Sequence, residues 1–496
     1  MSRPPVTWKA TFWVVVTLAL GLRLFQLGQN SLWIDEIASL RTIAGSFWEV
    51  AEAAMRHNAF EPPLYFWLLD IAAQLFGMSE VGVRLVSAIA GALTIPVVWL
   101  LAREMTRRED VAALCATLLA LNPLHIWYSQ EARPYALMVL FGSAALLFFA
   151  RAARSGSTRD WAGFAIATAL ALLSHVFGGT ALLTAWAWAL LRGNQAALRP
   201  LLGASLAVVI LIAPFYVPLF HATVIATNVG AHPRALTGLE IPYTVYTYLG
   251  GYSFGPSQRE IQDLGFQAAL TQNLGQVAVA VILLTIALAL AAARRTAASL
   301  AFAILFALPI VLAFVGSAVT TKPYSPRYTL LGLVGALALL SVAIIEQRGW
   351  RRAILVGLFC GASLWSDVQW FWVSRYWKED SRGAVSWLTG TLPAGARVGV
   401  APAYMERALA HYVSRQHSGL CVLGVDGDED FAGGSVPDAL LLSRRHHLPR
   451  WRQLERAFER EAGARPATDS IVGYRILLGE PPRSDTTRAG DRAGCR

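Results

Sequence analysis

Residues 62–76 read PPLYFWLLDIAAQLF, and this run decides the topology of the chain. It opens with two prolines and carries Asp70 in its middle. It is also shorter than the roughly 20 apolar residues that a helix needs to cross the hydrocarbon core of a bilayer. If it does not cross, every short basic connection between the other apolar runs falls on one side, as the positive-inside rule requires. We therefore predict that 62–76 is a helix packed near the outer interface.

Eleven other apolar runs approach the length of a membrane span. They are 11–27, 81–102, 111–127, 135–150, 160–174, 176–191, 200–219, 274–293, 298–318, 326–345 and 353–369. The first run has no small-residue cleavage site, so we interpret it as an uncleaved span. The predicted fold class is a mainly α, polytopic helical membrane protein of about eleven spans. Its N-terminus is cytoplasmic and its large first outer loop is 28–80.

The charged residues divide the chain into two parts. Only 15% of all residues are charged, whereas soluble proteins average about 25%. Residues 367–496 hold 34 charged side chains in 130 positions, and residues 1–366 hold the other 40. We predict a transmembrane region at 1–366, a small α/β domain on the outer, periplasmic side at 367–480, and a disordered tail at 481–496.

The net charge of +10 does not indicate a nucleic-acid partner. The basic residues concentrate in the inner connections, at 103–108, 151–159, 192–199, 294–295 and 348–352, where they anchor the topology. The four cysteines show no metal-ligand spacing and do not suggest a disulfide framework.

The C-terminal domain alternates short helices and strands. Apolar runs bounded by Gly, Pro or charge predict strands at 397–401, 419–423, 439–443 and 471–478, and helices at 381–388, 404–414 and 450–462. The acidic stretch 426–430 resembles a calcium loop only superficially, and we interpret it as a solvated turn.

Polar residues of the membrane region that have no anchoring purpose all fall in the predicted outer loops. The first loop carries Asp35 and Glu36. Adjacent carboxylates there could supply a general base and an orienting partner. The alternative is a helix N-terminus, where acidic side chains cap the backbone and favour the helix dipole. On the dipeptide alone, the capping alternative is favoured.

Three further outer loops add candidates. Glu131 and Arg133 lie between two spans, where they could form a structural ion pair. The functional alternative is that Glu131 holds a cation, either an arginine or a metal, beside the first-loop carboxylates. A lone interfacial histidine such as His175 is more often structural than catalytic. Lys322 and Arg327 precede a late span, either as snorkelling anchors or as a phosphate clamp.

At these residues the chain resembles the membrane glycosyltransferases of the GT-C fold that use polyprenyl-phosphate sugars. Protein O-mannosyltransferases and lipid A aminoarabinose transferases belong to this group. The resemblance runs over most of residues 10–390 and is carried by 33–36, 61–66, 128–135, 326–328 and 379–382.

The resemblance implies roles for individual residues. Asp35 is the catalytic base, Glu36 assists acceptor binding or holds the site, and Glu131 is the acid of the second outer loop. The implied donor-phosphate ligands are Lys322 and Arg327, with Arg133 and His175 as looser assignments. The implied substrate-binding residues are Tyr65, Tyr324 and Tyr328. Family members differ in metal use, and no ligand cluster in the sequence settles whether a divalent metal takes part.

The expected activity is that of an inverting hexosyl- or pentosyltransferase in the bacterial inner membrane. The expected partners are a polyprenyl-phosphate-linked sugar donor, membrane lipids, and a glycan, lipid or protein acceptor in the cell envelope. The alternatives are a polytopic transporter or lipid flippase, and a catalytically silent scaffold. Transporters tend to show internal repeats and polar sites at the membrane midplane, and the sequence shows no convincing repeat.

Overall fold

The computed structural model describes residues 8–57, 61–227, 236–292, 296–319, 323–434, 436–443, 449–468 and 471–479. The chain forms two compact units. The first comprises Met1–Leu27, Ser39–Phe254 and Gly275–Phe371, and the second comprises Gly28–Ala38, Gly255–Leu274 and Trp372–Arg496. The sequence-based boundary at 366/367 stays a prediction. In the structure, the second unit also includes two segments that precede this boundary.

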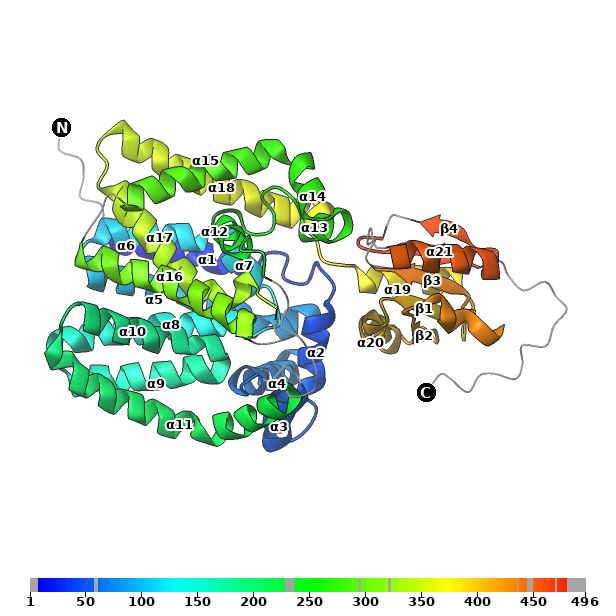
Figure 1. The fold of residues 1–496 in the computed structure, drawn as a ribbon, viewed down its shortest axis with the longest axis horizontal. Coiled ribbons are helices and arrows are strands. Elements are labelled where there is room, and N and C mark those ends of the chain that lie inside the picture. Colours follow the sequence, from blue (N-terminus) through cyan, green and yellow to red (C-terminus); the bar gives the residue numbers. More distant parts are fainter. Residues whose placement is uncertain are drawn as a thin grey trace. The chain divides into compact units, whose positions relative to one another are not determined.

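The first unit is built from helices (Figure 1). They are α1 (Trp8–Leu24), α3 (Phe47–His57), α4 (Leu64–Phe76), α5 (Glu80–Thr106), α6 (Glu109–Ala120), α7 (Pro123–Ser129), α8 (Tyr135–Ser155), α9 (Thr158–Ser174), η1 (Val176–Gly179), α10 (Thr180–Leu191), α11 (Gln195–Thr227), α12 (Glu240–Gly250), α15 (Leu274–Ala292), α16 (Ala297–Val319), η2 (Pro326–Thr329), α17 (Leu330–Ile345) and α18 (Trp350–Trp372). Helix α2 (Ile34–Thr42) begins in the second unit and ends in the first.

The described residues contain six helices that are long and apolar enough to cross a membrane, or up to eight if each bent pair counts as one span. The bent pairs are α6 with α7, at 59°, and α14 (Phe266–Gln272) with α15, at 93°. All eleven predicted runs coincide with helices, but α1 and α9 have only 17 residues each. The mainly helical membrane fold is confirmed, whereas the count of eleven crossings stays a prediction.

The run 62–76 forms the short helix α4. Its 13 residues extend about 20 Å at 1.5 Å per residue, less than the hydrocarbon core of about 30 Å. The Trp67 ring stacks on Phe47 of α3 with 4.1 Å between ring centres, and Trp67 Nε1 donates a hydrogen bond to Phe47 O at 2.9 Å. Helices α3 and α4 therefore pack on each other, and their place at the outer interface stays a prediction.

Glycines let α16 and α17 approach closely in the interior of the first unit. A Cβ atom at Gly335 would lie 2.6 Å from Phe306 N and 2.7 Å from Phe302 O, both in the backbone of α16. Small residues allow such close contact between membrane helices, where packing is a main source of helix association.

The second unit contains a five-stranded sheet in the order β2-β1-β3-β5-β4. Its strands are β1 (Arg397–Ala401), β2 (Cys421–Gly424), β3 (Ala439–Leu442), β4 (Arg465–Thr468) and β5 (Arg475–Leu478). Strands β2, β1 and β3 are parallel, and β3, β5 and β4 are antiparallel. Helices and turns of this unit are α13 (Gln258–Leu264), α14, η3 (Ser374–Tyr376), α19 (Ser381–Thr391), η4 (Ala403–Met405), α20 (Glu406–Gln416), η5 (Asp428–Gly434) and α21 (Pro449–Ala462).

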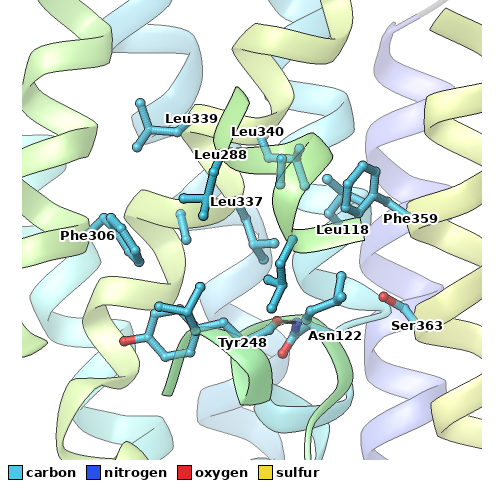
Figure 2. A pocket seen from close by; sticks show the side chains of 15 residues that line it. Leu118, Asn122, Tyr248, Leu288, Phe306, Leu337, Leu339, Leu340, Phe359 and Ser363 are labelled. Carbon is cyan, nitrogen blue, oxygen red and sulfur yellow. Dashed lines mark hydrogen bonds between the residues drawn. The ribbon is translucent and has the colours of Figure 1, made fainter. Parts of the chain in front are cut away.

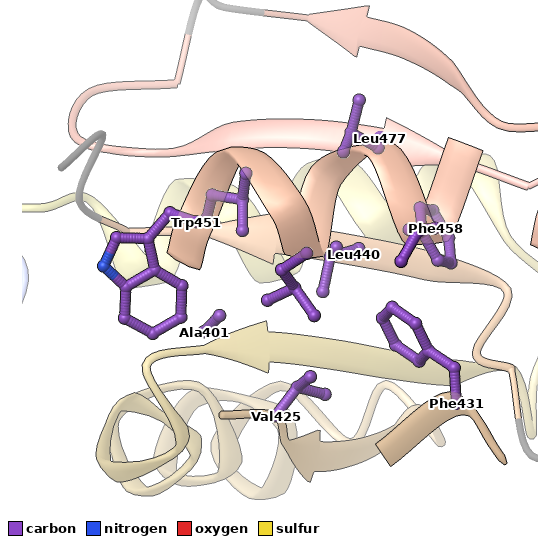
Figure 3. Packing of buried hydrophobic residues seen from close by; sticks show 10 residues of the cluster. Ala401, Val425, Phe431, Leu440, Trp451, Phe458 and Leu477 are labelled. Carbon is purple, nitrogen blue, oxygen red and sulfur yellow. The ribbon is translucent and has the colours of Figure 1, made fainter. Parts of the chain in front are cut away.

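Helix α21 supplies part of the core of this α/β domain. Its Trp451, Leu454 and Phe458 pack against Leu440 and Leu477 from neighbouring strands (Figure 3). The small C-terminal sheet was predicted, but β4 was missed, because Pro466 argues against a strand unless it lies at an edge.

The cysteines and the acidic stretch complete the comparison with the sequence. Cys421 is disulfide-bonded, which the cysteine spacing did not suggest, whereas Cys115 and Cys360 are free. In the acidic stretch, the Asp430 side chain accepts hydrogen bonds from Asp426 N and Gly427 N, as in a turn. The predicted disordered tail, 481–496, lies outside the described residues.

Candidate functional site

Two of the predicted phosphate-binding arginines meet at one aromatic ring. The guanidinium carbons of Arg133 and Arg327 both lie 5.8 Å from the centre of the Tyr135 ring, and that of Arg327 lies 5.3 Å from the Tyr328 ring. Tyr135 begins α8, and Arg327 lies in η2 directly before α17. An aromatic ring beside a guanidinium stabilises its positive charge through a cation–π interaction, so the Tyr135 ring helps to hold two cations close together.

His175 joins the same cluster through stacked rings. Its ring centre lies 5.7 Å from that of Tyr328 and 5.4 Å from that of Tyr135. Phe177 stacks on Tyr328 at 5.2 Å, almost parallel. His175 also caps η1, because its Nδ1 accepts a hydrogen bond from Phe177 N at 3.2 Å. The histidine therefore has a structural role in ordering the turn, and its ring packs beside the arginine cluster.

Arg133 forms a buried ion pair with Glu61. Its Nη2 lies 2.5 Å from Glu61 Oε1, and the two side chains are only 5% and 7% exposed. Its Nη1 donates to Ser39 Oγ at 3.3 Å, and its carbonyl accepts from Ser87 Oγ at 3.0 Å. Ser87 Oγ in turn lies 3.3 Å from the hydroxyl of Tyr65. Arg133 is thus fixed from three sides, and the predicted substrate ligand Tyr65 belongs to its surroundings.

Glu131 is fully buried in the turn that connects α7 to α8. Its carbonyl accepts a hydrogen bond from Arg133 N at 2.7 Å. Tyr128, three residues before it in the chain, hydrogen-bonds the hydroxyl of Tyr252 at 2.8 Å. The structure therefore places Glu131 next to the arginine cluster in the chain, in a buried turn.

Reciprocal contacts between α1 and the α6–α7 break hold this turn in place. Arg23 of α1 donates hydrogen bonds to the carbonyls of Leu119 and Ala120 at the end of α6. Gln130 donates to the carbonyls of Arg23 and Phe25 near the end of α1. Each side chain satisfies carbonyls that a helix end leaves without an intrahelical partner. The broken span is therefore a fixed feature that positions 131–133.

The first-loop carboxylates belong to the second unit and lie in the first turn of α2. Asp35 is partly exposed, whereas Glu36 is fully buried. Glu36 Oε2 accepts a hydrogen bond from Trp33 N at 3.3 Å and lies 3.6 Å from the ammonium nitrogen of Lys378. Glu36 therefore caps the helix, whereas the alternative from the sequence assigned the cap to Asp35 and a favourable interaction with the helix dipole to Glu36. This geometry favours a role in holding the site over a direct chemical role.

The remaining predicted ligands are distributed as follows. The Tyr324 hydroxyl lies 2.6 Å from Thr244 Oγ1 of α12, and its ring lies 6.4 Å from that of Phe314. Lys322 lies outside the described residues. No group of three or more His, Cys, Asp or Glu side chains that could hold a metal ion occurs within the described ranges.

Glu61 and Lys378 were not singled out from the sequence, yet both contact predicted site residues. Glu61 is an acid directly before two prolines that precede an apolar helix. Lys378 is a rare lysine that directly precedes Glu379 after the last span. Both signals were visible, but the partners lie 72 and 342 positions away, beyond the reach of local patterns.

The first unit also contains an apolar cavity of about 90 Å³ (Figure 2). Its polar lining, from Asn122, Tyr248 and Ser363, gathers at one end, and leucines occupy the other. Asn122 Nδ2 donates to Tyr248 O at 2.8 Å, and the Tyr248 hydroxyl donates to Thr329 O. Thr329 ends η2, the turn that carries Arg327, so hydrogen bonds connect the cavity wall to the turn of the arginine cluster.

Comparisons with known proteins agree with this architecture. Residues 60–220 match the model of the dolichyl-phosphate-mannose-protein mannosyltransferase family. The undecaprenyl phosphate-α-4-amino-4-deoxy-L-arabinose arabinosyl transferase of Pseudomonas paraeruginosa is 30% identical over 115 residues, 22% of this chain and 21% of that protein. A second such transferase, from Pseudomonas fluorescens, is 28% identical over 182 residues, 33% of this chain and 30% of that protein. The matched segments thus span less than a third of the length of these two relatives.

Solved structures extend the likeness to nearly the whole chain. ArnT from Cupriavidus metallidurans bound to undecaprenyl phosphate superposes with a TM-score of 0.56 at 15% identity, covering 94% of this chain and 98% of that one. The archaeal oligosaccharyltransferase AglB from Archaeoglobus fulgidus, in complex with an inhibitory peptide and a dolichol-phosphate, gives 0.53 at 13% identity, covering 88% and 69%. At such low identity the likeness shows the fold alone. The chain has the GT-C fold, and its residues 60–220 match the dolichyl-phosphate-mannose-protein mannosyltransferase family.

Proposed function

We propose that this chain is an inverting glycosyltransferase that moves a sugar from a polyprenyl-phosphate carrier to an acceptor at the outer face of a bacterial inner membrane. The observation that carries the proposal is the pair of arginines, Arg133 and Arg327, whose guanidinium carbons both lie 5.8 Å from the centre of the Tyr135 ring. Guanidinium groups bind phosphate through two parallel hydrogen bonds and keep their charge at any working pH.

The reaction assigned to these residues is a single displacement. An acceptor hydroxyl attacks the anomeric carbon while Asp35 takes its proton. The bond between the anomeric carbon and the phosphate oxygen breaks, and the polyprenyl phosphate leaves with the bonding electrons. Arg327 and Arg133 stabilise the charge that develops on the leaving oxygen. One displacement inverts the configuration of the anomeric carbon.

The donor lipid needs an apolar path beside its phosphate site. The leucine-lined cavity suits an isoprenoid chain, and hydrogen bonds link its polar end to the η2 turn that carries Arg327. The lipid-binding relatives support the same interpretation, since undecaprenyl phosphate is bound in the ArnT structure and dolichol-phosphate in the AglB structure.

Two observations support the outer location of the α/β domain. The basic residues of the short connections favour one side, which becomes the cytoplasmic side. Cys421 is disulfide-bonded, and disulfides persist in oxidising compartments such as the periplasm.

Labelling of a Met78→Cys variant in intact cells tests this orientation. We expect an impermeant maleimide to reach residue 78 from outside, and protection until the cells are lysed would contradict the topology.

Donor turnover by the purified chain in nanodiscs tests the activity. Two probes are undecaprenyl-phosphate-linked mannose and undecaprenyl-phosphate-linked 4-amino-4-deoxy-L-arabinose, the sugars of the two related families. We expect release of undecaprenyl phosphate from one of them once envelope glycans are added as acceptors. Mass spectrometry of surface glycans with and without the gene then identifies the acceptor. An unchanged glycan profile, together with movement of lipid between leaflets, would support the flippase alternative.

A further inference from the structure

The backbone just before the first-loop carboxylates is hydrogen-bonded to the α/β domain within the second unit. The Ser31 hydroxyl donates to Glu379 O at 2.8 Å and accepts from Ser381 N at 3.1 Å. Leu32 N donates to the hydroxyl of Tyr412, a residue of α20, at 2.7 Å. Arg382 reaches the carbonyl of Gln29 at 2.7 Å. These bonds fix the backbone of residues 29–32, immediately before α2.

Lys378 adds a contact to the Glu36 carboxylate. Its side chain is only 6% exposed, its ammonium lies 5.2 Å from the centre of the Trp33 ring, and it lies 3.6 Å from Glu36 Oε2. Glu36, 0% exposed, uses the same oxygen to accept the Trp33 amide hydrogen. Leaving a buried carboxylate without its cation is strongly unfavourable, so the lysine stabilises the Glu36 carboxylate that caps the helix.

The cap fixes the first turn of α2, where Asp35 lies directly before Glu36. Trp33 N is bound by the Glu36 side chain, and Trp33 O accepts from Glu36 N at 2.9 Å and from Ile37 N at 3.0 Å. Asp35 lies between Trp33 and Glu36, so these bonds set the direction of its backbone. Any loosening of the Glu36 cap therefore displaces the Asp35 side chain.

From this geometry we propose that Lys378 is a positioning residue for Asp35, acting through Glu36, and that the α/β domain serves to hold the catalytic loop. The inference rests on the proposed function for its kinetic consequence, but its structural consequence is independent of it. It gives the domain a role in the chemistry even though none of its residues needs to touch the donor.

The experiment compares Lys378→Met with Lys378→Arg and with a matched control in the full-length protein in nanodiscs. The control is Arg475→Met, which removes a 2.6 Å ion pair with Glu455 elsewhere in the same unit. Hydrogen exchange followed by mass spectrometry reports on the peptide covering 30–37. We expect Lys378→Met to speed exchange in this peptide about tenfold, because the Glu36 carboxylate that accepts the Trp33 amide hydrogen is no longer held by the ammonium group. Lys378→Arg and Arg475→Met keep wild-type protection there.

Turnover of the donor probe that wild type uses supplies the second readout. For Lys378→Met we expect kcat to fall about 100-fold, since small displacements of a reacting group have effects of that size. The KM for the donor stays within about threefold, because the arginines that bind the phosphate are intact. Lys378→Arg restores most of kcat, and Arg475→Met leaves it unchanged.

Unchanged exchange in 30–37 after Lys378→Met would overturn the positioning role, as would an equal loss of kcat in Arg475→Met. A wild-type protein that turns over neither donor would contradict the proposed function instead. The exchange result then decides the positioning role by itself.

Discussion

Variants of the buried pair of Arg133 and Glu61 can show whether Arg133 is a phosphate ligand or only part of a structural ion pair. Its two charged atoms are 2.5 Å apart, and both side chains are nearly inaccessible to solvent. Removing one member leaves an uncompensated charge, which costs about 3–5 kcal/mol of folding stability. Arg133→Met and Glu61→Gln should therefore both lower the free energy of unfolding, with less effect for Gln because it still accepts a hydrogen bond.

The Kd for undecaprenyl phosphate should separate the two variants. Arg133→Met removes a charge-assisted hydrogen bond worth about 1.5–3 kcal/mol, so Kd should rise by about tenfold to a hundredfold. Glu61→Gln removes the carboxylate that competes with the phosphate for the guanidinium, so Kd should stay equal or fall.

The assay is thermophoresis of labelled protein in nanodiscs, titrated with undecaprenyl phosphate. Arg103→Met is the control. It breaks a 2.7 Å ion pair between Arg103, near the C-terminal end of α5, and Glu109, and it should leave Kd unchanged. If Glu61→Gln weakens binding as much as Arg133→Met does, the pair is structural and Arg133 is no phosphate ligand.

Two further predictions address the cluster and the bundle. Arg327→Ala should weaken binding of undecaprenyl phosphate at least tenfold, with little effect on the KM for the acceptor. Arg327→Lys should recover only part of this affinity, because an ammonium lacks the planar guanidinium fork that lies against the Tyr328 ring. An unchanged Kd in Arg327→Ala would count against the clamp. Gly335→Val should lower stability by about 1–3 kcal/mol, measured by thermal unfolding in detergent, since its side chain would clash with the α16 backbone. Wild-type stability would show that the two helices can separate at no cost.

Apolar runs and turn signals predicted most of the helices, because a membrane span has a strong local signature. The same reasoning identified 62–76 as a short helix, since two prolines and a central acid make a poor span. The break in the 111–127 run also had a local signal. Asn122 caps α7 and Pro123 occupies its first turn, as expected of an Asn-Pro pair.

Contacts between distant parts of the chain account for what the sequence missed. Asp35 and Glu36 look equivalent as a dipeptide, but the structure buries Glu36 against Lys378 and leaves Asp35 partly exposed. Pairing of Arg133 with Glu61 instead joins the turn before α8 to the residues before α4, which are 72 positions apart in the chain. Such partners are determined by tertiary packing, which a single sequence does not encode in any local period.

Donor turnover by Asp35→Asn in purified protein tests the central claim most directly. Asp70→Asn is the matched control, because Asp70 is a carboxylate of α4 that only accepts a hydrogen bond from Gln74 at 2.9 Å among the contacts that the structure describes. We predict that Asp35→Asn lowers turnover of the donor by at least about 100-fold while its Kd for undecaprenyl phosphate stays within about threefold of wild type, and that Asp70→Asn changes neither. Wild-type turnover by folded Asp35→Asn protein would contradict the assignment of the base.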